Sequence, residues 1–420
     1  MYTTKLANDY IKKNKYSVNN KYRFKYHAMP PIGWMNDPNG LIYFNNEYHL
    51  FYQYNPYNSI SGPMHWGHFT SKDLVVFKDE DVVLAPEAID ETGCFSGGAI
   101  VDEVTKELVL FYTKHYEKYG VKFETQNIVK SKDGINFVKN DGNIISTSMI
   151  PEHADKYDFR DPNPYYKDGY YYVFIGSKNE YNQGQILVYR SIDLVNFEYH
   201  FTIGPNKYFG DMAECPDFFT IDGYDVILVS ATNLKAESNR FLNVNSSLYL
   251  IGKMDFENKK YEIIKVEEID GGHDFYAPQT LLDNKNRRIM IGWLNMWGKD
   301  YYTHKLGHKW SGALTIPRKL SIKDGHFMQY PIDEIKNYQT NKRGFTNGML
   351  ISKSSDLLFK LGNGNFNFKF SNPNNDDDYF IIGLDDGELY LDSSKSILWP
   401  QTRRNSLFKY NKEVELRILP

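Results

Sequence analysis

The amino-acid sequence predicts an all-β protein, a five-bladed β-propeller followed by a partial β-sandwich. Helical periodicity is nearly absent, and short aromatic or β-branched runs alternate with clusters of Gly, Asn, Asp and Pro. The related segments SKDLVVF, SKDGINF and SIDLVNF begin at Ser71, Ser131 and Ser191, about 60 residues apart. This spacing suits one four-stranded propeller blade with long loops.

A second repeat defines the blades themselves. Five segments share a polar start, a strand, a tight turn and a second apolar strand. They begin at Asp37, Phe95, Asp161, Glu214 and Asp274. Tight turns are expected at Asn45-Asn46, Asp168-Gly169 and Asp222-Gly223. Five such hairpins arranged radially bring their strand starts to one end of a central channel, so the four acidic starts are expected around one pocket. The alternative is that each acid merely caps a turn.

The pattern changes after about Arg318. A polar stretch, DEIKNYQTNKRGFTNG, precedes five alternating segments with shorter spacing: DLLFKL, NFNFKF, YFIIGL, ELYLD and VELRIL. We therefore expect a propeller over residues 1–325, a linker over 326–345 and a partial sandwich over 346–420. An incomplete sandwich exposes apolar surface and a strand edge, which predicts marginal stability, self-association or completion by a second chain.

Composition narrows the class of partner. A net charge of −4 gives no support to nucleic-acid or anionic-membrane binding. Two cysteines, Cys94 and Cys215, cannot form a disulfide framework or a thiolate zinc site. No signal-like apolar core or 18-residue apolar run occurs, so a cytoplasmic, non-membrane protein is expected. Aromatic residues reach 16%, and their rings favour strands and also form platforms for sugars.

Three of the acids have surroundings that suit the cleavage of a glycosidic bond, which requires two carboxyl groups across a pocket. Asp37 lies between Asn36 and a Pro-Asn-Gly turn, where N–H groups can hold it ionised as a nucleophile. Glu214 lies in the apolar stretch MAECPDFF, which favours a raised pKa and a role as general acid.

Asp161 directly follows Arg160 in the sequence FRDP. The neighbouring charge predicts a permanently ionised carboxylate that accepts hydrogen bonds from sugar hydroxyls and helps to keep Glu214 protonated. The alternative for this pair is a buried structural ion pair without a catalytic role.

Seven motifs occur in the order GWMNDPNG, FYQYNP, HWGH, CFSGGA, FRDP, ECP and DFYAPQ. From about Tyr26 onwards, this set resembles the β-fructofuranosidases of glycoside hydrolase family 32, which comprise invertases, fructanases and sucrose-6-phosphate hydrolases. The resemblance implies a retaining glycosidase acting on sucrose, sucrose 6-phosphate or a short fructan. No metal or organic cofactor is expected, because positioned carboxyl groups suffice for the chemistry.

The resemblance also implies residue roles. Asp37 corresponds to the nucleophile, Asp161 to the transition-state stabiliser and Glu214 to the acid/base. The residues expected to line the substrate pocket are Trp34, Met35, Asn36, Gln53, Trp66, Phe95, Ser96, Arg160, Tyr276 and Trp293. Two features depart from the family pattern: Gly98 replaces a small polar residue, and the family's sandwich normally continues further.

Some alternatives stay open at this stage. A fructosyltransferase uses the same covalent intermediate, and a catalytically silent propeller could bind a sugar without cleaving it. The segment Trp297–Trp310 contains Lys299 and Lys305 and is expected at the pocket mouth, where lysines suit a phosphate dianion. The alternative for this segment is a solvated basic loop.

Overall fold

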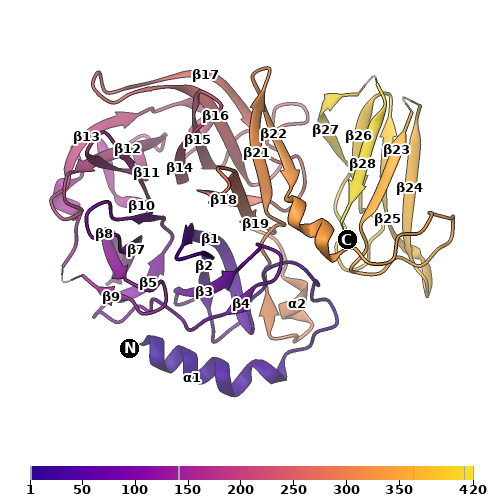
Figure 1. The fold of residues 1–420 in the computed structure, drawn as a ribbon, viewed down its shortest axis with the longest axis horizontal. Helices are drawn as coiled ribbons and strands as arrows, with labels where there is room; N and C mark the ends of the chain where they lie inside the picture. Colours follow the sequence, from indigo (N-terminus) through magenta and orange to yellow (C-terminus); the bar gives the residue numbers. More distant parts are fainter. Residues whose placement is uncertain (1, 141, 363, 411, 420) are drawn as a thin grey trace.

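The computed structural model describes residues 2–140, 142–362, 364–410 and 412–419. Five β-sheets are arranged radially around a central axis, and two further sheets lie beside them at one end (Figure 1). The expectation of an all-β propeller followed by a sandwich is confirmed. Met1 and Pro420, the outer limits of the two predicted domains, lie outside the described residues.

The radial sheets follow one another along the chain. The first contains β20 (Trp310–Ser311), β1 (Gly33–Phe44), β2 (Glu47–Asn55), β3 (His65–Ser71) and β4 (Lys78–Asp79). The second contains β5 (Glu91–Phe95), β6 (Ala99–Val101), β7 (Leu108–Lys118), β8 (Val121–Ser131) and β9 (Val138–Lys139). The third contains β10 (Ala154–Lys167), β11 (Tyr170–Asn179), β12 (Gly184–Ser191) and β13 (Glu198–Ile203). The fourth contains β14 (Ala213–Ile221), β15 (Tyr224–Thr232), β16 (Asn245–Asp255) and β17 (Lys260–Glu268). The fifth contains β18 (Tyr276–Leu282), β19 (Arg288–Trp293), β21 (Arg318–Lys323) and β22 (His326–Pro331).

The innermost strands contact one another around the axis. Strand β1 packs beside β6 and β18, while β10 packs beside β7 and β14, and β14 packs beside β18. Strand β20 follows β19 in the sequence but pairs in parallel with β1, matching Trp310 with Gly33. The segment between β19 and β21 thereby adds a strand to the first sheet, and β1 also packs beside β19 of the fifth.

Turn chemistry explains where the strands end. Asn45 and Asn46 have φ angles of 48° and 63°, and Asp168 and Gly169 have 50° and 85°, as type I′ hairpin turns require. The Ser-x-Asp repeats form the loops between the last two strands of each of the first three blades. In each loop the Asp carboxylate accepts two backbone N–H groups, as Asp133 does from residues 135 and 136. The 60-residue repeat therefore marks equivalent loops of successive blades.

The inner strands share a bulge. The pairing register shifts in β10, β14 and β18, and the bulged residues Asp161, Cys215 and Ala277 have φ angles of 65°, 47° and 47°. In β1 the register shifts twice, between Met35 and Pro38 and between Asn39 and Ile42, and Gly40 has a φ of 53°. Positive φ is strained for residues with a side chain, and such bulges often lie next to active sites. The same backbone distortion thus recurs at one level of the channel.

Hydrophobic clusters fill the spaces between adjacent blades. One cluster joins the third and fourth sheets and includes Phe174, Phe218 and Ile227, all buried. Another joins the first and fifth sheets and includes Leu50 and Leu281. Burying a large apolar side chain contributes about 1.5–3 kcal/mol, so these clusters hold the inner strands in register.

The fifth sheet extends beyond the boundary expected at residue 325. Asp324 and Gly325 form a tight turn with φ angles of 52° and 71°, and β22 then pairs along β21. This turn lies inside the last hairpin of the fifth sheet. A 3₁₀ helix, η4 (Asp333–Tyr338), follows. We therefore propose a domain boundary after Pro331.

The C-terminal region consists of two small sheets. One contains β23 (Leu357–Leu361) and β28 (Val414–Ile418). The other contains β24 (Phe366–Asn372), β25 (Asn375–Asp385), β26 (Glu388–Asp392) and β27 (Arg404–Lys409). All five segments expected here are strands, and β27 is an additional one. The rings of Phe359 and Phe368 lie 4.2 Å apart and join the two sheets.

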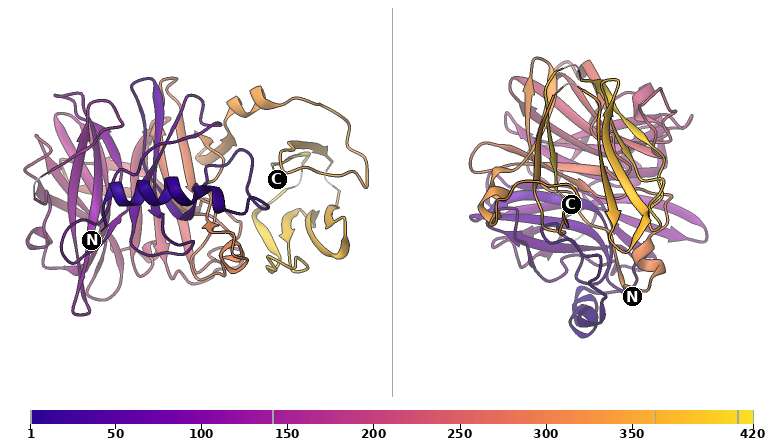
Figure 2. Two further views of the ribbon diagram at one scale, coloured as in Figure 1. Left: turned by 90° about the horizontal axis from the view of Figure 1, so that it is seen from below. Right: turned by 90° about the vertical axis from the view of Figure 1, so that its right-hand side faces the viewer.

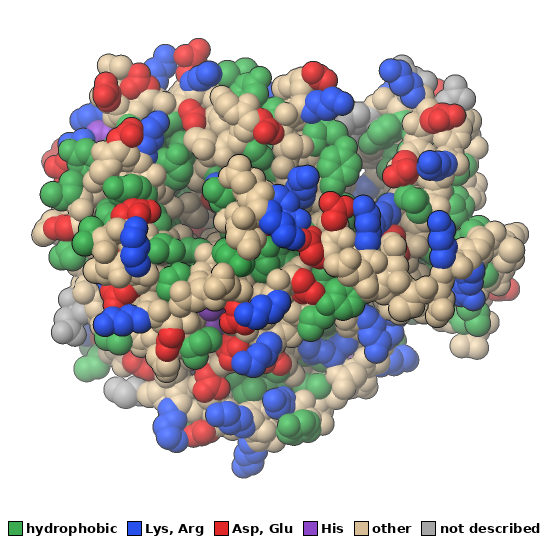
Figure 3. Space-filling view, viewed as in Figure 1, with side chains coloured by type: hydrophobic (Ala, Val, Ile, Leu, Met, Phe, Trp, Pro, Cys, Tyr) green, Lys and Arg blue, Asp and Glu red, His purple; other side chains and the backbone are tan. Residues whose placement is uncertain are grey.

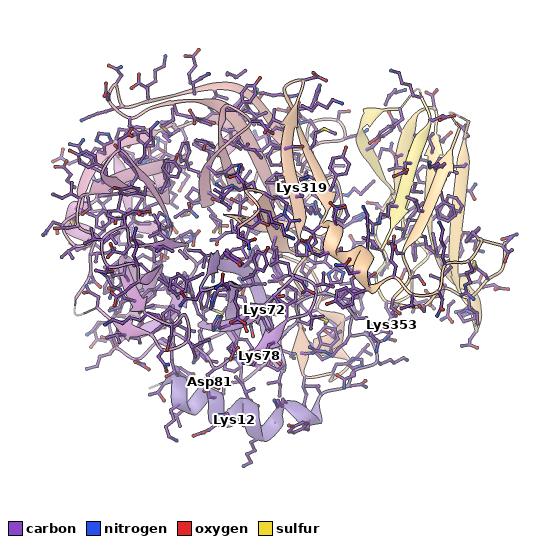
Figure 4. All side chains as sticks on the ribbon, viewed as in Figure 1. Lys12, Lys72, Lys78, Asp81, Lys319 and Lys353 are labelled. Atoms are coloured by element: carbon purple, nitrogen blue, oxygen red, sulfur yellow. The ribbon has the colours of Figure 1, made fainter. Side chains whose placement is uncertain are left out.

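The sequence did not predict the N-terminal helix α1 (Thr4–Asn14). Figure 2 shows α1 along the outer side of the propeller. Thr3 caps the helix by accepting a hydrogen bond from the Leu6 N–H, and Asn8 accepts one from the Val82 N–H at 2.9 Å. On the same helix, Lys12 lies 3.8 Å from the carboxylate of Asp81 (Figure 4). An isolated helix of this length is marginal in water, so contacts with the first blade stabilise it.

The surface carries mixed charge. Lysines, arginines and acidic residues are interspersed over the face shown in Figure 3 rather than gathered by sign. Two short helices and several 3₁₀ turns are the helical elements of the described chain, and none is long and apolar enough to span a bilayer.

Candidate active site

The three predicted acids lie on inner strands of the first, third and fourth blades, at the level of the repeated bulge. Asp37 and Asp161 are both buried. The thiol of Cys215 lies between them, with Sγ 3.7 Å from Asp37 Oδ2 and 3.5 Å from Asp161 Oδ2. The fold therefore gathers carboxylates that are far apart in the sequence.

Asp37 is held by two side-chain donors. Ser96 Oγ donates to Oδ2 at 2.7 Å, and Asn36 Nδ2 donates to Oδ1 at 3.0 Å. Trp34 Nε1 in turn donates to Asn36 Oδ1 at 2.8 Å. Burial raises the pKa of Asp37 and the charge of Glu214 raises it further, while these hydrogen bonds lower it. The donors sit on both oxygens and fix the orientation of the carboxylate.

Glu214 is bound by a cation and a phenol. Arg160 donates to Oε1 at 2.7 Å, and Tyr276 Oη donates to Oε2 at 2.5 Å. Both partners directly precede a bulged residue, as Glu214 does, so the three side chains occupy equivalent positions in consecutive blades. The expectation that this carboxylate lies against an apolar wall is therefore wrong, because polar side chains from the neighbouring blades reach it.

Asp161 differs from its expected state. Its Oδ2 accepts the Cys215 N–H at 3.0 Å, yet burial raises its pKa to about 7. Arg160 lowers this pKa, whereas the charges of Glu214 and Asp37 raise it. The guanidinium directs its N–H groups at other carboxylates, so the prediction of permanent ionisation is wrong.

Arg160 is the centre of an ion-pair network. Its Nη1 lies 2.7 Å from Asp158 Oδ1 and 3.5 Å from Glu124 Oε2. Glu124 is fully buried, and it also accepts hydrogen bonds from His115 Nδ1 at 2.9 Å and from the Phe159 N–H at 2.7 Å. Arg160 thus belongs to a partly buried structural ion-pair network and is at the same time a direct partner of Glu214.

Aromatic rings form a wall beside the acids. The ring of Trp34 lies 4.4 Å from Tyr301, 5.6 Å from Trp293 and 6.0 Å from Trp297. Tyr276 and Cys215 belong to the same hydrophobic cluster. Trp293 Nε1 is buried without a hydrogen-bond partner among the described residues. An indole N–H normally finds an acceptor when buried, so this donor suits a ligand oxygen.

The remaining predicted pocket residues divide into two groups. Phe95 belongs to the aromatic cluster and stacks on His115 at 4.1 Å. Gln53 donates to the Cys94 carbonyl at 3.0 Å and supports the same strand. Met35 and Trp66 are fully buried in two other hydrophobic clusters, and Trp66 Nε1 donates to the Phe95 carbonyl at 3.1 Å. Neither belongs to the aromatic cluster that contains Trp34 and Trp293.

Asp274 does not join the other acids through any described contact. It precedes β18, and its carboxylate accepts hydrogen bonds from Lys299 at 2.8 Å and from Trp399 Nε1 at 3.1 Å. The bulge register makes Tyr276, not Asp274, the equivalent of Glu214. The expectation of four equivalent acidic strand starts is therefore wrong, because the hairpin alignment was displaced by one residue in the third blade and by two in the fifth.

The two lysines considered for phosphate binding are both paired. Lys299 Nζ bonds Asp274, and Lys305 Nζ lies 2.6 Å from Asp300. The segment nevertheless reaches the site through its aromatic residues, Trp297 and Tyr301. The mixture of aromatic and basic residues in this stretch was the available signal, and its aromatic residues are the ones that contact Trp34.

Other functional residues escaped sequence analysis. The sequence indicated no role for Cys215 in the site, and its thiol contacts both Asp37 and Asp161. Glu124 and His115 lie on adjacent strands of the second blade, and nothing in their local sequence indicates a buried ion pair. The described residues contain no group of three or more His, Cys, Asp or Glu side chains arranged as for a metal ion.

Comparison with known proteins agrees with this geometry. Residues 27–331 match the glycosyl hydrolases family 32 N-terminal domain. The sucrose-6-phosphate hydrolase of Staphylococcus xylosus is 39% identical over 326 residues, which cover 77% of this chain and 64% of that protein. The sucrose-6-phosphate hydrolase of Bacillus subtilis is 34% identical over 340 residues, covering 79% of this chain and 70% of that protein. The alignments thus leave about a third of each relative uncovered.

Solved structures extend the similarity to the sandwich. The sucrose-6-phosphate hydrolase of Lactobacillus gasseri superposes with a TM-score of 0.87 and 25% identity, covering 99% of this chain and 90% of that one. The GH32 β-fructofuranosidase of Bombyx mori superposes with a TM-score of 0.85 and 32% identity, covering 99% and 88%. With its inner-strand acids and a domain match spanning most of the propeller, the chain belongs to glycosyl hydrolase family 32.

Proposed function

We propose that the protein is a retaining β-fructofuranosidase that hydrolyses sucrose or sucrose 6-phosphate through a covalent fructosyl-enzyme intermediate. The observation that carries the proposal is the different environment of two carboxylates. Asp37 is oriented by donors on both oxygens, as a nucleophile requires, and Glu214 is held between Arg160 and Tyr276. Family membership and the names of the relatives support the same activity.

The reaction has two steps. Asp37 attacks the anomeric carbon, C2 of the fructosyl unit, while Glu214 gives its proton to the departing glycosidic oxygen. The C2–O bond to the glucosyl unit breaks and a C2–Oδ ester forms. Glu214, now ionised, takes a proton from water, whose oxygen attacks C2 and releases Asp37. Asp161 in its ionised form accepts hydrogen bonds from the sugar hydroxyls.

The fructosyl pocket is proposed to be lined by side chains of the aromatic cluster and the polar groups around Asp37. These are Trp34, Asn36, Phe95, Ser96, Arg160, Tyr276 and Trp293, with Gln53 in support. A mutant of the Bombyx mori relative has been solved in complex with sucrose, at 31% identity and a TM-score of 0.83, which favours a sucrose-type ligand. Hydrolysis of a phosphorylated sugar imported by the cell would suit the expected cytoplasmic location.

Substitution of the two acids tests the mechanism. Asp37→Ala and Glu214→Ala should each abolish turnover of sucrose and sucrose 6-phosphate, because each group enters a bond-breaking step. Azide should partly restore Glu214→Ala on fructosides with good leaving groups, since their departure needs no proton. Glu103→Gln, an exposed acid paired with Lys106, serves as the control and should retain activity.

Product stereochemistry and product identity separate the alternatives. Early NMR spectra should show released β-fructose, and inverted fructose would reject Asp37 as the nucleophile. Oligosaccharides accumulating in place of free fructose would instead indicate a fructosyltransferase. Turnover of fructans in preference to both sucrose substrates would indicate a fructanase. Sugar binding without any turnover by the wild-type protein would indicate a silent propeller.

A further inference from the structure

The sandwich contacts the active-site region through one tryptophan. Trp399 lies in the segment between β26 and β27, and its Nε1 donates to Asp274 Oδ2 at 3.1 Å. The Lys299 ammonium lies 5.6 Å from the centroid of the Trp399 ring, and the ring of Tyr302 meets it edge-on at 5.5 Å. Trp399 therefore contacts both Asp274, two residues before β18, and the segment that follows β19.

These contacts lead to the two acids by short paths. On one side, Asp274 is two residues before Tyr276, whose hydroxyl donates to Glu214. On the other side, Tyr302 follows Tyr301, whose ring lies 4.4 Å from Trp34. Trp34 holds Asn36, and Asn36 holds Asp37. The contacts around Glu214 and the contacts around Asp37 thus both lead to the indole ring of Trp399.

The ion pair under the indole is largely shielded from water. The side chains of Lys299 and Asp274 are only 15% and 23% exposed, and Lys299 also donates to the His273 carbonyl. His273 is buried and its Nε2 lies 2.8 Å from the Thr402 carbonyl of the same sandwich segment. A shielded ion pair with hydrogen bonds on both partners has a fixed geometry, unlike an exposed pair.

The segment after Lys299 has little support of its own. Helix α2 (Tyr302–Lys305) spans four residues, and its lateral contacts include His304 Nδ1 with Ser59 Oγ at 2.8 Å. So short a helix does not keep its shape without tertiary contacts. The position of Tyr301 against Trp34 therefore depends on what is packed against its neighbours.

We infer that Trp399 is a positioning residue through which the sandwich holds the aromatic wall of the active site, an inference that rests on the proposed function for its kinetic part. Trp399 touches neither acid. It fixes Asp274, Lys299 and Tyr302, which carry Tyr276 and Tyr301 into the site. Loss of this contact should loosen the wall while Ser96 and Asn36 still hold Asp37. Substrate binding should therefore suffer more than the chemical step.

The first test uses hydrogen exchange and does not depend on activity. In Trp399→Ala, amides of residues 301–306 should exchange faster than in the wild type. The hydrogen bonds from the Lys305 and Leu306 N–H groups to the Tyr301 and Tyr302 carbonyls should open more often. Lys353→Ala is the matched control: Lys353 also links the sandwich to the propeller, through the Lys21 carbonyl at 2.8 Å (Figure 4). It should leave exchange at 301–306 unchanged. Unchanged exchange in Trp399→Ala would overturn the inference.

The second test is kinetic. Trp399→Ala should lower kcat/KM on sucrose or sucrose 6-phosphate by about 10- to 100-fold, with KM rising more than kcat falls. Trp399→Phe keeps a ring for Lys299 and Tyr302 and should recover part of the loss, and it remains informative if the alanine variant does not fold. A fall in kcat with KM unchanged, or equal losses in Lys353→Ala, would overturn the positioning role.

A double-mutant comparison identifies the path. If Trp399 acts through the wall, the loss in Trp399→Ala/Tyr301→Ala should be close to that of the worse single variant, whereas independent effects would multiply. Multiplying losses would overturn the path through Tyr301. The outcomes also separate this inference from the proposed function: inactive wild-type protein would reject the function, whereas the exchange result would still decide whether Trp399 holds the wall.

Discussion

Tyr276 donates a 2.5 Å hydrogen bond to Glu214, and the two residues occupy the same position in adjacent blades. Arg160 occupies that position in the blade on the other side and bonds the second oxygen of Glu214 at 2.7 Å. The carboxylate is therefore held from both sides by its own counterparts in the propeller repeat. Its geometry depends on the closeness of the blades as much as on any local loop.

Tyr276→Phe tests the value of this hydrogen bond. The substitution keeps the ring and removes the donor, so kcat/KM should fall about 10- to 100-fold, the range expected for a hydrogen bond to a charged group. Steady-state kinetics on sucrose and sucrose 6-phosphate measure the loss. Tyr261→Phe removes a hydroxyl that donates to the Leu250 carbonyl at 2.8 Å elsewhere in the fourth blade, and it should leave kcat/KM unchanged. Equal kinetic losses in the two variants would contradict the prediction.

The raised pKa of Asp161 predicts a dependence of stability on pH. Its folded-state pKa of about 7 lies above the ordinary value of 3.8, so its contribution to stability is present below that ordinary value and is lost as pH rises through about 7. Asp161→Asn should therefore melt at a higher temperature than the wild type at pH 8, and the gain should shrink towards pH 4. Thermal melts at both pH values measure it.

Asp133 provides a control of opposite sign. Backbone N–H groups of its turn hold the pKa of this carboxyl well below its usual range. Asp133→Asn should therefore lose stability at pH 8 and approach the wild type in acid. A gain in Asp161→Asn that is the same at pH 4 and pH 8 would show that burial of the charge is not its cause.

Glu124→Gln should disturb the site without touching the three acids. It removes a buried negative charge that faces Arg160 at 3.5 Å and accepts a hydrogen bond from His115. Removing one member of a buried ion-pair network destabilises the protein, so both the melting temperature and kcat/KM should fall. Glu103→Gln, which breaks an exposed pair with Lys106, should change neither. An unchanged kcat/KM in Glu124→Gln would show that the ion-pair network does not support the site.

The pairing of Lys299 changes what is expected of the basic segment. Because Lys299 is neutralised by Asp274, Lys299→Met should lower activity on sucrose and sucrose 6-phosphate by similar factors. Lys305 is exposed and paired with Asp300, and Lys305→Met should change either activity less than twofold, as for a typical surface pair. A selective loss on the phosphorylated substrate would restore the phosphate-binding role for these lysines.

The sandwich is expected to be the weaker domain. Among its described residues only Leu384 and Leu416 are buried apolar side chains. Calorimetry should therefore resolve two transitions, with the sandwich melting first, and light scattering should detect larger species as the protein concentration rises. A single sharp transition from a monomer at all concentrations would contradict both expectations.

Features that depend on local interactions could be predicted from the sequence, whereas features that depend on tertiary contacts could not. Hairpin turns such as Asp168-Gly169 are local, so the blades could be predicted from the residues alone. The roles proposed for Asp37 and Glu214 could be predicted from their motifs. The partners of Glu214 could not, since Arg160 and Tyr276 reach it only when neighbouring blades pack together. For the same reason the pKa of Asp161 was misjudged: a neighbour in sequence need not point at the group beside it.

Helix α1 and the two-residue displacement at Asp274 have a related origin. A short helix stabilised by docking leaves little periodic signal in its own sequence. A hairpin alignment counts residues from the turn. The position of a side chain at the channel depends instead on the bulge, which is set by pairing between strands. Neither feature is visible without tertiary contacts.

The repeated bulge has a consequence for how this active site can change over evolutionary time. Three blades offer the same backbone to three chemically unrelated side chains, a guanidinium, a carboxylate and a phenol. A single codon change at any of them alters the charge pattern of the site while the scaffold keeps its shape. Substitutions can therefore change the chemistry of the site one residue at a time, without a change in the backbone of the propeller.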